Sequence, residues 1–187
     1  MALYRYVPSR DDLLDGIVER VIDELYADPL VHLEPDGSWQ EYLIRLGQGV
    51  RRMALVHPQV FPLIATRPPA APWVRPPLRS LRWVEAFLRG LLSQGFSHED
   101  AVYAYRAFSS FLLGHLLLEV SALGVDTTPI DEPNQPAPAV VPPSEVLRDY
   151  PLLVELSSHL GRYEFEAEFE DSLHNLLDRL GPGTAHA

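Results

Sequence analysis

The feature that most constrains the fold of this chain is a helix start that occurs three times. Ser9, Ser38 and Ser97 are each followed three residues later by an acidic residue, which is the spacing of a helix N-cap and the acid that returns a hydrogen bond to it. Apolar residues then recur every three or four positions, as they do along one face of a helix. These signals predict helices over 9–27, 38–56 and 97–123, and each cap stabilises its helix by about 1 kcal/mol.

Stop signals define the remaining elements. Pro68 ends a short helical pattern, and Gly95 followed by Phe96 is typical of a helix C-terminus. The further helices that we expect span 57–67, 76–94, 144–160 and 163–180. The segment 125–144 is rich in proline and has no periodic face, which predicts a loop. Because no alternating strand pattern is visible, the sequence predicts an all-α fold, a bundle of about seven helices.

Composition favours a single globular domain inside the cell. The 187 residues are 47% hydrophobic, which is enough for one domain of ordinary size with a core. The chain has no cysteine, so disulfides and thiolate metal sites are excluded, and a cytoplasmic protein is the simplest interpretation. No uninterrupted apolar run reaches the roughly 18 residues of a membrane span, and no signal peptide is visible. We therefore expect no membrane partner.

The charge of the chain argues against nucleic acid as a direct partner. Fifteen basic residues, all of them arginine, face 26 acidic residues, which gives a formal net charge of −11. Proteins gain most of their affinity for DNA and RNA from cationic side chains on phosphates. We expect the chain by itself to hold neither.

Several short stretches carry a resemblance to a known family. The stretch LYRYVPSRDDLL at 3–14 resembles the junction between the recognition helix and the first regulatory helix of TetR-family transcriptional repressors. Stretches similar to the tetracycline-repressor branch follow in the same order: SWQEYL at 38–43, TRP at 66–68, QGFS at 94–97, AVYA at 101–104, LG at 113–114 and Glu119. The resemblance implies a TetR-like regulatory helical bundle.

The resemblance also implies a division of the chain. In the family, two helices and the start of the recognition helix precede the position of Leu3, so residues 1–8 correspond to a remnant of the DNA-recognition helix and most of the helix-turn-helix is lacking. Tyr4, Tyr6 and Arg10 fall where the family contacts DNA, and DNA is expected as a partner only through the missing N-terminal helix-turn-helix. Residues 9–182 correspond to the ligand-binding and dimerisation domain, with 183–187 as a disordered tail.

The family's ligand pocket maps onto seven positions of this chain. They are Tyr26, Leu46, Val50, Leu63, Thr66, Leu88 and Glu119. The magnesium-ligating histidine of the tetracycline repressors falls on Leu63, and polar tetracycline contacts fall on other leucines, so we expect an unknown, mostly apolar small molecule, no metal and no cofactor. A one-residue gap between Ser38 and Thr66 leaves the register open there, and Leu46 and Val50 fit a core as well as a pocket.

The resemblance implies a homodimer with a four-helix interface formed by the helices over 97–123 and 163–180. The residues expected in it are Phe111, His115, Phe165, Phe169, Leu173, Leu176, Leu177 and Leu180. The last six form one apolar stripe, which we expect to be too long for a single chain to cover.

The function that these expectations favour is small-molecule sensing and dimerisation in a TetR-like repressor, truncated so that it cannot bind DNA alone. A stand-alone helical interaction module is the alternative. A metal-dependent enzyme ranks third, because His115 and Glu119, four residues apart on one helix face, are only two ligands. No nucleophile, paired-acid or phosphate-loop pattern supports catalysis, so we expect no enzymatic activity.

Overall fold

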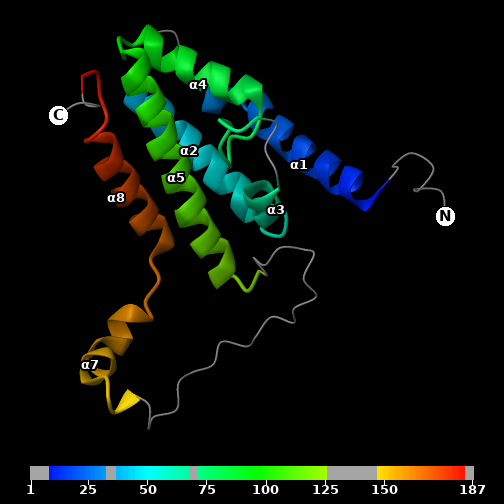
Figure 1. Cartoon of the computed structure of the whole chain (residues 1–187). Helices are drawn as coiled ribbons and strands as arrows, with labels where there is room; N and C mark the ends of the chain where they lie inside the picture. The colour runs from blue at the N-terminus through cyan, green and yellow to red at the C-terminus, as the bar shows by residue number, and fades with distance from the viewer. Residues whose placement is uncertain (1–8, 33–36, 68–70, 126–146, 184–187) are drawn as a thin grey trace.

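The computed structural model describes residues 9–32, 37–67, 71–125 and 147–183. Its elements, labelled as in Figure 1, are α1 (Arg10–Ala27), the 3₁₀ helix η2 (Pro29–Val31), α2 (Trp39–Val56), α3 (Phe61–Thr66), α4 (Leu81–Ser93), α5 (His98–Ala122), α7 (Pro151–Leu160) and α8 (Phe165–Leu177). No strand occurs in these four ranges, which confirms the all-α prediction. Tyr4, Tyr6, residues 126–144 of the expected loop and residues 184–187 of the tail lie outside the described residues.

The three serine caps form as expected. The Oγ atoms of Ser9, Ser38 and Ser97 accept hydrogen bonds from backbone N–H groups three residues on, at 3.1, 3.2 and 3.0 Å. At Ser38 the box is complete, because the Glu41 carboxylate also accepts from the Ser38 N–H at 3.3 Å. The ends of α1, α2 and α5 lie within one residue of the expected positions.

Four helices begin later than expected. The proline-containing stretch before α4 cannot form regular helix at Pro76 and Pro77, and α4 begins only after Ser80, whose Oγ accepts from the Trp83 N–H at 3.2 Å. Helix α7 begins at Pro151. Proline is tolerated at the first position of a helix, because the backbone N–H that it lacks would have no hydrogen-bond partner within the helix there. Helix α3 begins at Phe61, after a turn, and α8 at Phe165.

Helix α5 is the centre of the bundle. It packs against α2, α3, α4 and α8 (Figure 1), and Phe108, Leu112, Leu116 and Val120 are completely buried along it. Of the described helices, α5 alone is long and apolar enough to cross a membrane, although it contains no uninterrupted apolar run of that length. The central helix of a globular bundle can have this length and composition, so the place of α5 in the bundle accounts for both.

Much of the apolar stripe of α8 is covered within the chain itself. Phe169 and Leu173 are each only 1% exposed, and Leu177 and Leu180 are also buried, because α8 packs against α2 and α5. Gly47 on α2 permits this close approach, since a Cβ added there would lie 3.1 Å from the Leu173 Cδ2 atom. The expectation that one chain could not cover this stripe is wrong for these four residues, whereas Phe165 and Leu176 stay partly exposed.

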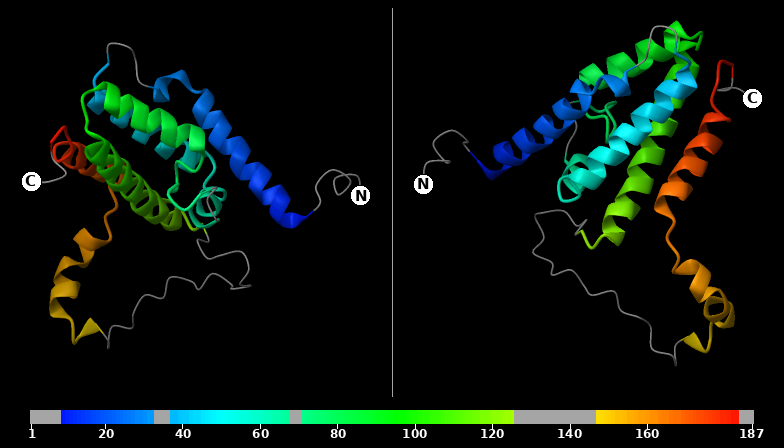
Figure 2. Two further views of the ribbon diagram at one scale, coloured as in Figure 1. Left: turned by 45° about the horizontal axis from the view of Figure 1, so that its top comes forward. Right: turned by 180° about the vertical axis from the view of Figure 1, so that it is seen from behind.

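Helix α7 is the opposite case. It stands away from the bundle in all three views (Figure 2), and every one of its ten residues is exposed. Its large apolar side chains are Leu152, Leu153, Val154, Leu156 and Leu160. A helix of ten residues is short for independent stability in water. Burial of its apolar surface against another surface would stabilise it.

Candidate ligand-sensing site and its connection to helix α1

The seven expected pocket residues lie on five helices. Leu46 and Val50 of α2 are completely buried in the core, which fits the core interpretation of these two positions. Leu63 of α3, Leu88 of α4 and Tyr26 of α1 are partly buried and pack against that core. These three therefore line the boundary between core and surface.

Glu119 lies in a buried ion pair that the sequence did not reveal. Its carboxylate accepts two hydrogen bonds from Arg51 of α2, at 2.7 Å from Nη2 and 3.0 Å from Nε. The hydrogen bond with Glu119 raises the pKa of Arg51, and the guanidinium carbon lies 5.7 Å from the centre of the Phe169 ring. The pair therefore joins α2 to α5 beneath α8.

This pairing weakens the metal hypothesis. His115 contacts the rings of Phe111 and Phe169, with centroids 5.7 and 5.2 Å away, whereas Glu119 binds Arg51. Among the described residues, no group of three or more histidines and acids is placed to hold a metal ion.

Thr66 does not face an interior cavity as a pocket residue would. Its side chain is exposed, and its hydroxyl donates a hydrogen bond to the Pro62 carbonyl of its own helix at 2.8 Å. The next residue, Arg67, is the C-cap of α3. Its side chain makes ion pairs with α1.

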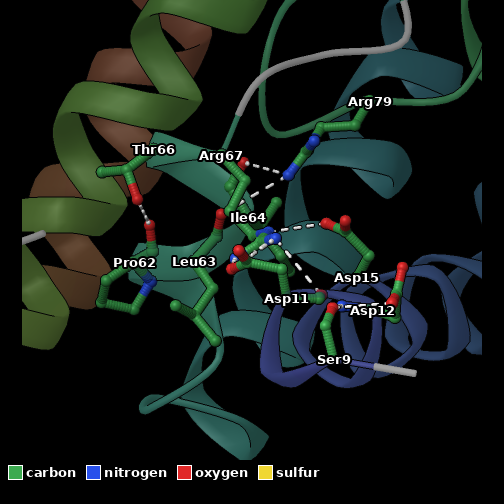
Figure 3. Close-up of polar contacts among 10 residues, drawn as sticks. All are labelled: Ser9, Asp11, Asp12, Asp15, Pro62, Leu63, Ile64, Thr66, Arg67 and Arg79. Atoms are coloured by element: carbon green, nitrogen blue, oxygen red, sulfur yellow. Dashed lines mark hydrogen bonds and ion pairs between the residues drawn. The ribbon is translucent and has the colours of Figure 1, made fainter. Parts of the chain in front are cut away.

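Arg67 connects α3 to the first turns of α1 (Figure 3). Its Nε atom lies 2.6 Å from Asp15 Oδ1 and its Nη1 atom 3.3 Å from Asp11 Oδ1. The hydrogen bond from Arg67 lowers the pKa of Asp15 and, reciprocally, raises the pKa of Arg67. The Arg67 side chain is 16% exposed, whereas both carboxylates are largely exposed.

Arg79 completes this arrangement from the segment before α4. Its Nη1 atom lies 3.4 and 3.5 Å from the carbonyl oxygens of Leu63 and Ile64 near the end of α3 (Figure 3). The Leu63 carbonyl also accepts from the Arg67 N–H at 3.1 Å. Burial lowers the pKa of Arg79. We call Asp11, Asp15, Arg67 and Arg79 the α1–α3 polar cluster.

The other end of α1 carries an aromatic cluster, which we define as Tyr26, His32 and Trp83. The ring centroids of Tyr26 lie 4.7 Å from His32 and 5.0 Å from Trp83, both edge-on. His32 and Trp83 are nearly parallel, 5.8 Å apart. The Arg82 guanidinium covers the Tyr26 ring at 3.7 Å. Sequence reasoning identified Tyr26 alone, because nothing in the local pattern brings η2 and α4 to it.

Of the DNA-contacting positions that the resemblance implies, the structure describes only Arg10. It is exposed at the first residue of α1. It lies next to the acids of the α1–α3 polar cluster along the chain.

The sequence matches the family described as tetracyclin repressor-like, C-terminal domain, over residues 32–181. The chain belongs to this family. The match covers every helix from α2 to α8, including the Arg51–Glu119 pair, and confirms the family resemblance for the regulatory domain. The members of the tetracycline repressor family similar to this chain are transcriptional regulators, not enzymes.

Individual relatives agree with this assignment. A helix-turn-helix-type transcriptional regulator of Saccharopolyspora erythraea is 29% identical over 118 residues, which are 63% of this chain and 46% of that protein. A helix-turn-helix-type transcriptional repressor of Mycobacterium tuberculosis is 25% identical over 188 residues, 96% of this chain and 67% of that protein. The chain thus spans about half to two thirds of the length of these relatives.

Solved structures of the tetracycline repressor family share the fold. A possible TetR family regulator from Streptomyces coelicolor A3(2) is 29% identical, with a TM-score of 0.66, over 95% of this chain and 80% of that one. The Streptomyces coelicolor TetR family protein ActR, in complex with actinorhodin, is 24% identical with a TM-score of 0.62, over 95% and 78% of the two chains.

Proposed function

We propose that residues 9–182 are the small-molecule-sensing and dimerisation domain of a cytoplasmic TetR-like transcriptional repressor. The observation that carries this proposal is the way α1 is held. The α1–α3 polar cluster binds its first turns, and the aromatic cluster binds its last turn. A rearrangement at either end must therefore reposition the helix.

The geometry of α1 turns a small rearrangement into a large displacement. The helix has 18 residues and is thus about 27 Å long. A tilt of about 10° about its C-terminal end moves its N-terminal end by about 5 Å. Two DNA half-sites about 34 to 36 Å apart tolerate little change in the separation of the heads that read them, so a ligand that prefers one tilt changes DNA occupancy.

The proposed ligand is a small organic molecule of mostly apolar character. The partly buried Tyr26, Leu63 and Leu88 supply apolar and aromatic surface at the edge of the core. ActR is known in complex with actinorhodin, which is a property of that protein and here supports only the general class of ligand.

The proposed dimer uses the outer faces of α5 and α8. Phe169, Leu173, Leu177 and Leu180 belong to the core of one chain. The residues that remain partly exposed and would contact the partner subunit are Phe111, His115, Phe165 and Leu176. Leu118 of α5, 68% exposed, adds to this surface.

Native mass spectrometry of the purified chain, combined with sedimentation equilibrium, tests the proposal. We expect a dimer at low micromolar concentration that carries a non-covalent small molecule or takes one up from a metabolite library. A dimer that binds no small molecule would favour the interaction module, for which the exposed apolar surface of α7 is the supporting observation. A monomer would contradict both.

A further inference from the structure

The indole N–H of Trp83 is a hydrogen-bond donor without a protein acceptor. Trp83 is completely buried, and its Nε1 atom, itself buried, has no partner among the described residues. Buried polar groups in proteins are nearly always paired, and an indole nitrogen can only donate. The atom therefore needs an acceptor that the described protein does not supply.

The His32 ring, which lies nearly parallel to Trp83, is fixed by its own contacts. The His32 Nε2 atom lies 2.7 Å from the Tyr26 carbonyl oxygen, and because a carbonyl can only accept, Nε2 carries the proton. The His32 carbonyl in turn accepts from Arg45 Nη2 at 3.3 Å. One of the two rings beside Trp83 is thus held in place.

The cover of the aromatic cluster, by contrast, is made of side chains near the surface. Tyr26 is partly exposed, and the Arg82 side chain above it is half exposed and pairs with the largely exposed Asp23 at 2.5 Å. Exposed ion pairs hold side chains only weakly. Tyr26 and Arg82 are therefore the side chains whose rotation would expose Trp83 to a ligand.

We propose that the Trp83 indole N–H is the hydrogen-bond donor that recognises the ligand of this domain, and that the ligand is a flat aromatic compound with a carbonyl acceptor. The donor requires an acceptor, and the rings of Tyr26, His32 and Trp83 favour a flat aromatic face. This assignment rests on the proposed sensor function and names the residue that gives the site its specificity.

Two probes of matched shape test the assignment, 1,4-naphthoquinone and naphthalene, which differ in the two carbonyl groups. The chain has no cysteine and no lysine, so the quinone meets no thiol and no lysine amine to which it could add. Proton–nitrogen NMR of the three indole groups separates Trp83 from Trp39 and Trp73. We expect the quinone to shift the Trp83 indole proton most, and to bind about five- to tenfold more tightly than naphthalene.

Trp83→Phe removes the N–H and keeps an aromatic ring. We expect it to weaken quinone binding to the level of naphthalene and to leave naphthalene binding nearly unchanged. Trp39→Phe is the matched control, since Trp39 is also buried but packs on Phe96, and it should keep the preference for the quinone. If Trp83→Phe does not fold, β-(3-benzothienyl)alanine at position 83, with sulfur in place of the N–H, makes the same test.

The assignment is overturned if the variant at position 83 keeps the preference for the quinone, if the quinone shifts another indole most, or if neither probe binds at millimolar concentration. Failure here is distinguishable from failure of the sensor function. A small molecule seen by native mass spectrometry on both the wild-type chain and Trp83→Phe would leave the sensor function standing and reject the role of Trp83.

Discussion

At the scale of single residues, the Arg51–Glu119 pair is an ion pair within the core. The Glu119 side chain is 4% exposed and that of Arg51 17%, and 68 positions separate them in the sequence. Burying two charges costs free energy that only close pairing offsets. Each partner therefore depends on the other for its place in the bundle.

Glu119→Gln should destabilise the fold by about 2 to 4 kcal/mol, because it leaves the Arg51 guanidinium buried beside a neutral amide. Urea unfolding followed by circular dichroism measures this. The double variant Arg51→Met with Glu119→Leu removes both charges and should recover most of the loss. A single variant as stable as the wild type would mean that the pair contributes nothing to the fold.

The Asp15 carboxylate gives the α1–α3 polar cluster a pH dependence. Its pKa in the folded protein lies below its ordinary value, because Arg67 donates a hydrogen bond to the ionised form. The stabilisation is therefore present above the ordinary pKa of about 3.9 and is lost as the pH falls below it. Asp15→Asn should remove this part of the acid sensitivity in unfolding experiments at pH 3 to 5. The pair Arg89–Glu85, in which both side chains are largely exposed, offers Glu85→Gln as a control.

At the scale of elements, the two attachments of α1 differ in kind. Its N-terminal end is held by exposed carboxylates on Arg67, and its C-terminal end by packed rings. Exposed ion pairs contribute about 0.2 to 1 kcal/mol each, whereas the buried residues of α1, Val18, Val21, Ile22 and Leu25, lie from its middle onward. The N-terminal half is thus the part that can move.

Arg67→Ala should increase hydrogen exchange in the first two turns of α1 by about fivefold, which corresponds to the loss of about 1 kcal/mol of ion-pair stabilisation. Mass spectrometry of peptides from residues 10–17 measures this, with Arg89→Ala as the matched control. Unchanged exchange in Arg67→Ala would show that the polar cluster does not hold the helix.

Local sequence signals predicted most helix boundaries, because a capping residue or a helix-ending residue lies within four residues of the boundary that it determines. The late start of α4 escaped prediction, since the serine that caps it, Ser80, has no acid three residues on. Periodicity identified the apolar face of α8 but not what covers it, because a stripe against α2 and a stripe against another subunit look alike in sequence. Contacts between distant segments, such as Trp83 with Tyr26, left no local signal.

At the scale of the whole molecule, assembly depends on surface that one chain leaves exposed. Leu118→Arg should separate the proposed dimer with little change in the fold, because Leu118 is exposed in the single chain and a charge in an apolar interface costs several kcal/mol. Sedimentation equilibrium measures the result. Leu81→Arg, at a comparably exposed position on α4, should remain a dimer, and equal behaviour of the two variants would move the interface elsewhere.

The 187 residues alone should not shift duplex DNA in an electrophoretic assay at physiological salt. A net charge of −11 opposes a polyanion, and cationic contacts supply most of the affinity in such complexes. Lowering the salt concentration should not produce a specific complex. A sequence-specific shift at nanomolar protein would contradict the assignment of these residues to sensing and assembly.

The unlike attachments of α1 make the domain responsive to its ionic surroundings. At 0.15 M salt, charges are screened over about 8 Å, and at 1 M over about 3 Å, so added salt weakens the ion pairs of Arg67 and leaves the ring contacts of Tyr26 intact. Salt then loosens the N-terminal end of α1, whereas the C-terminal end stays in place. A rise in ionic strength would thereby loosen the same helix that the proposed ligand repositions, so that salt and ligand would act on one element.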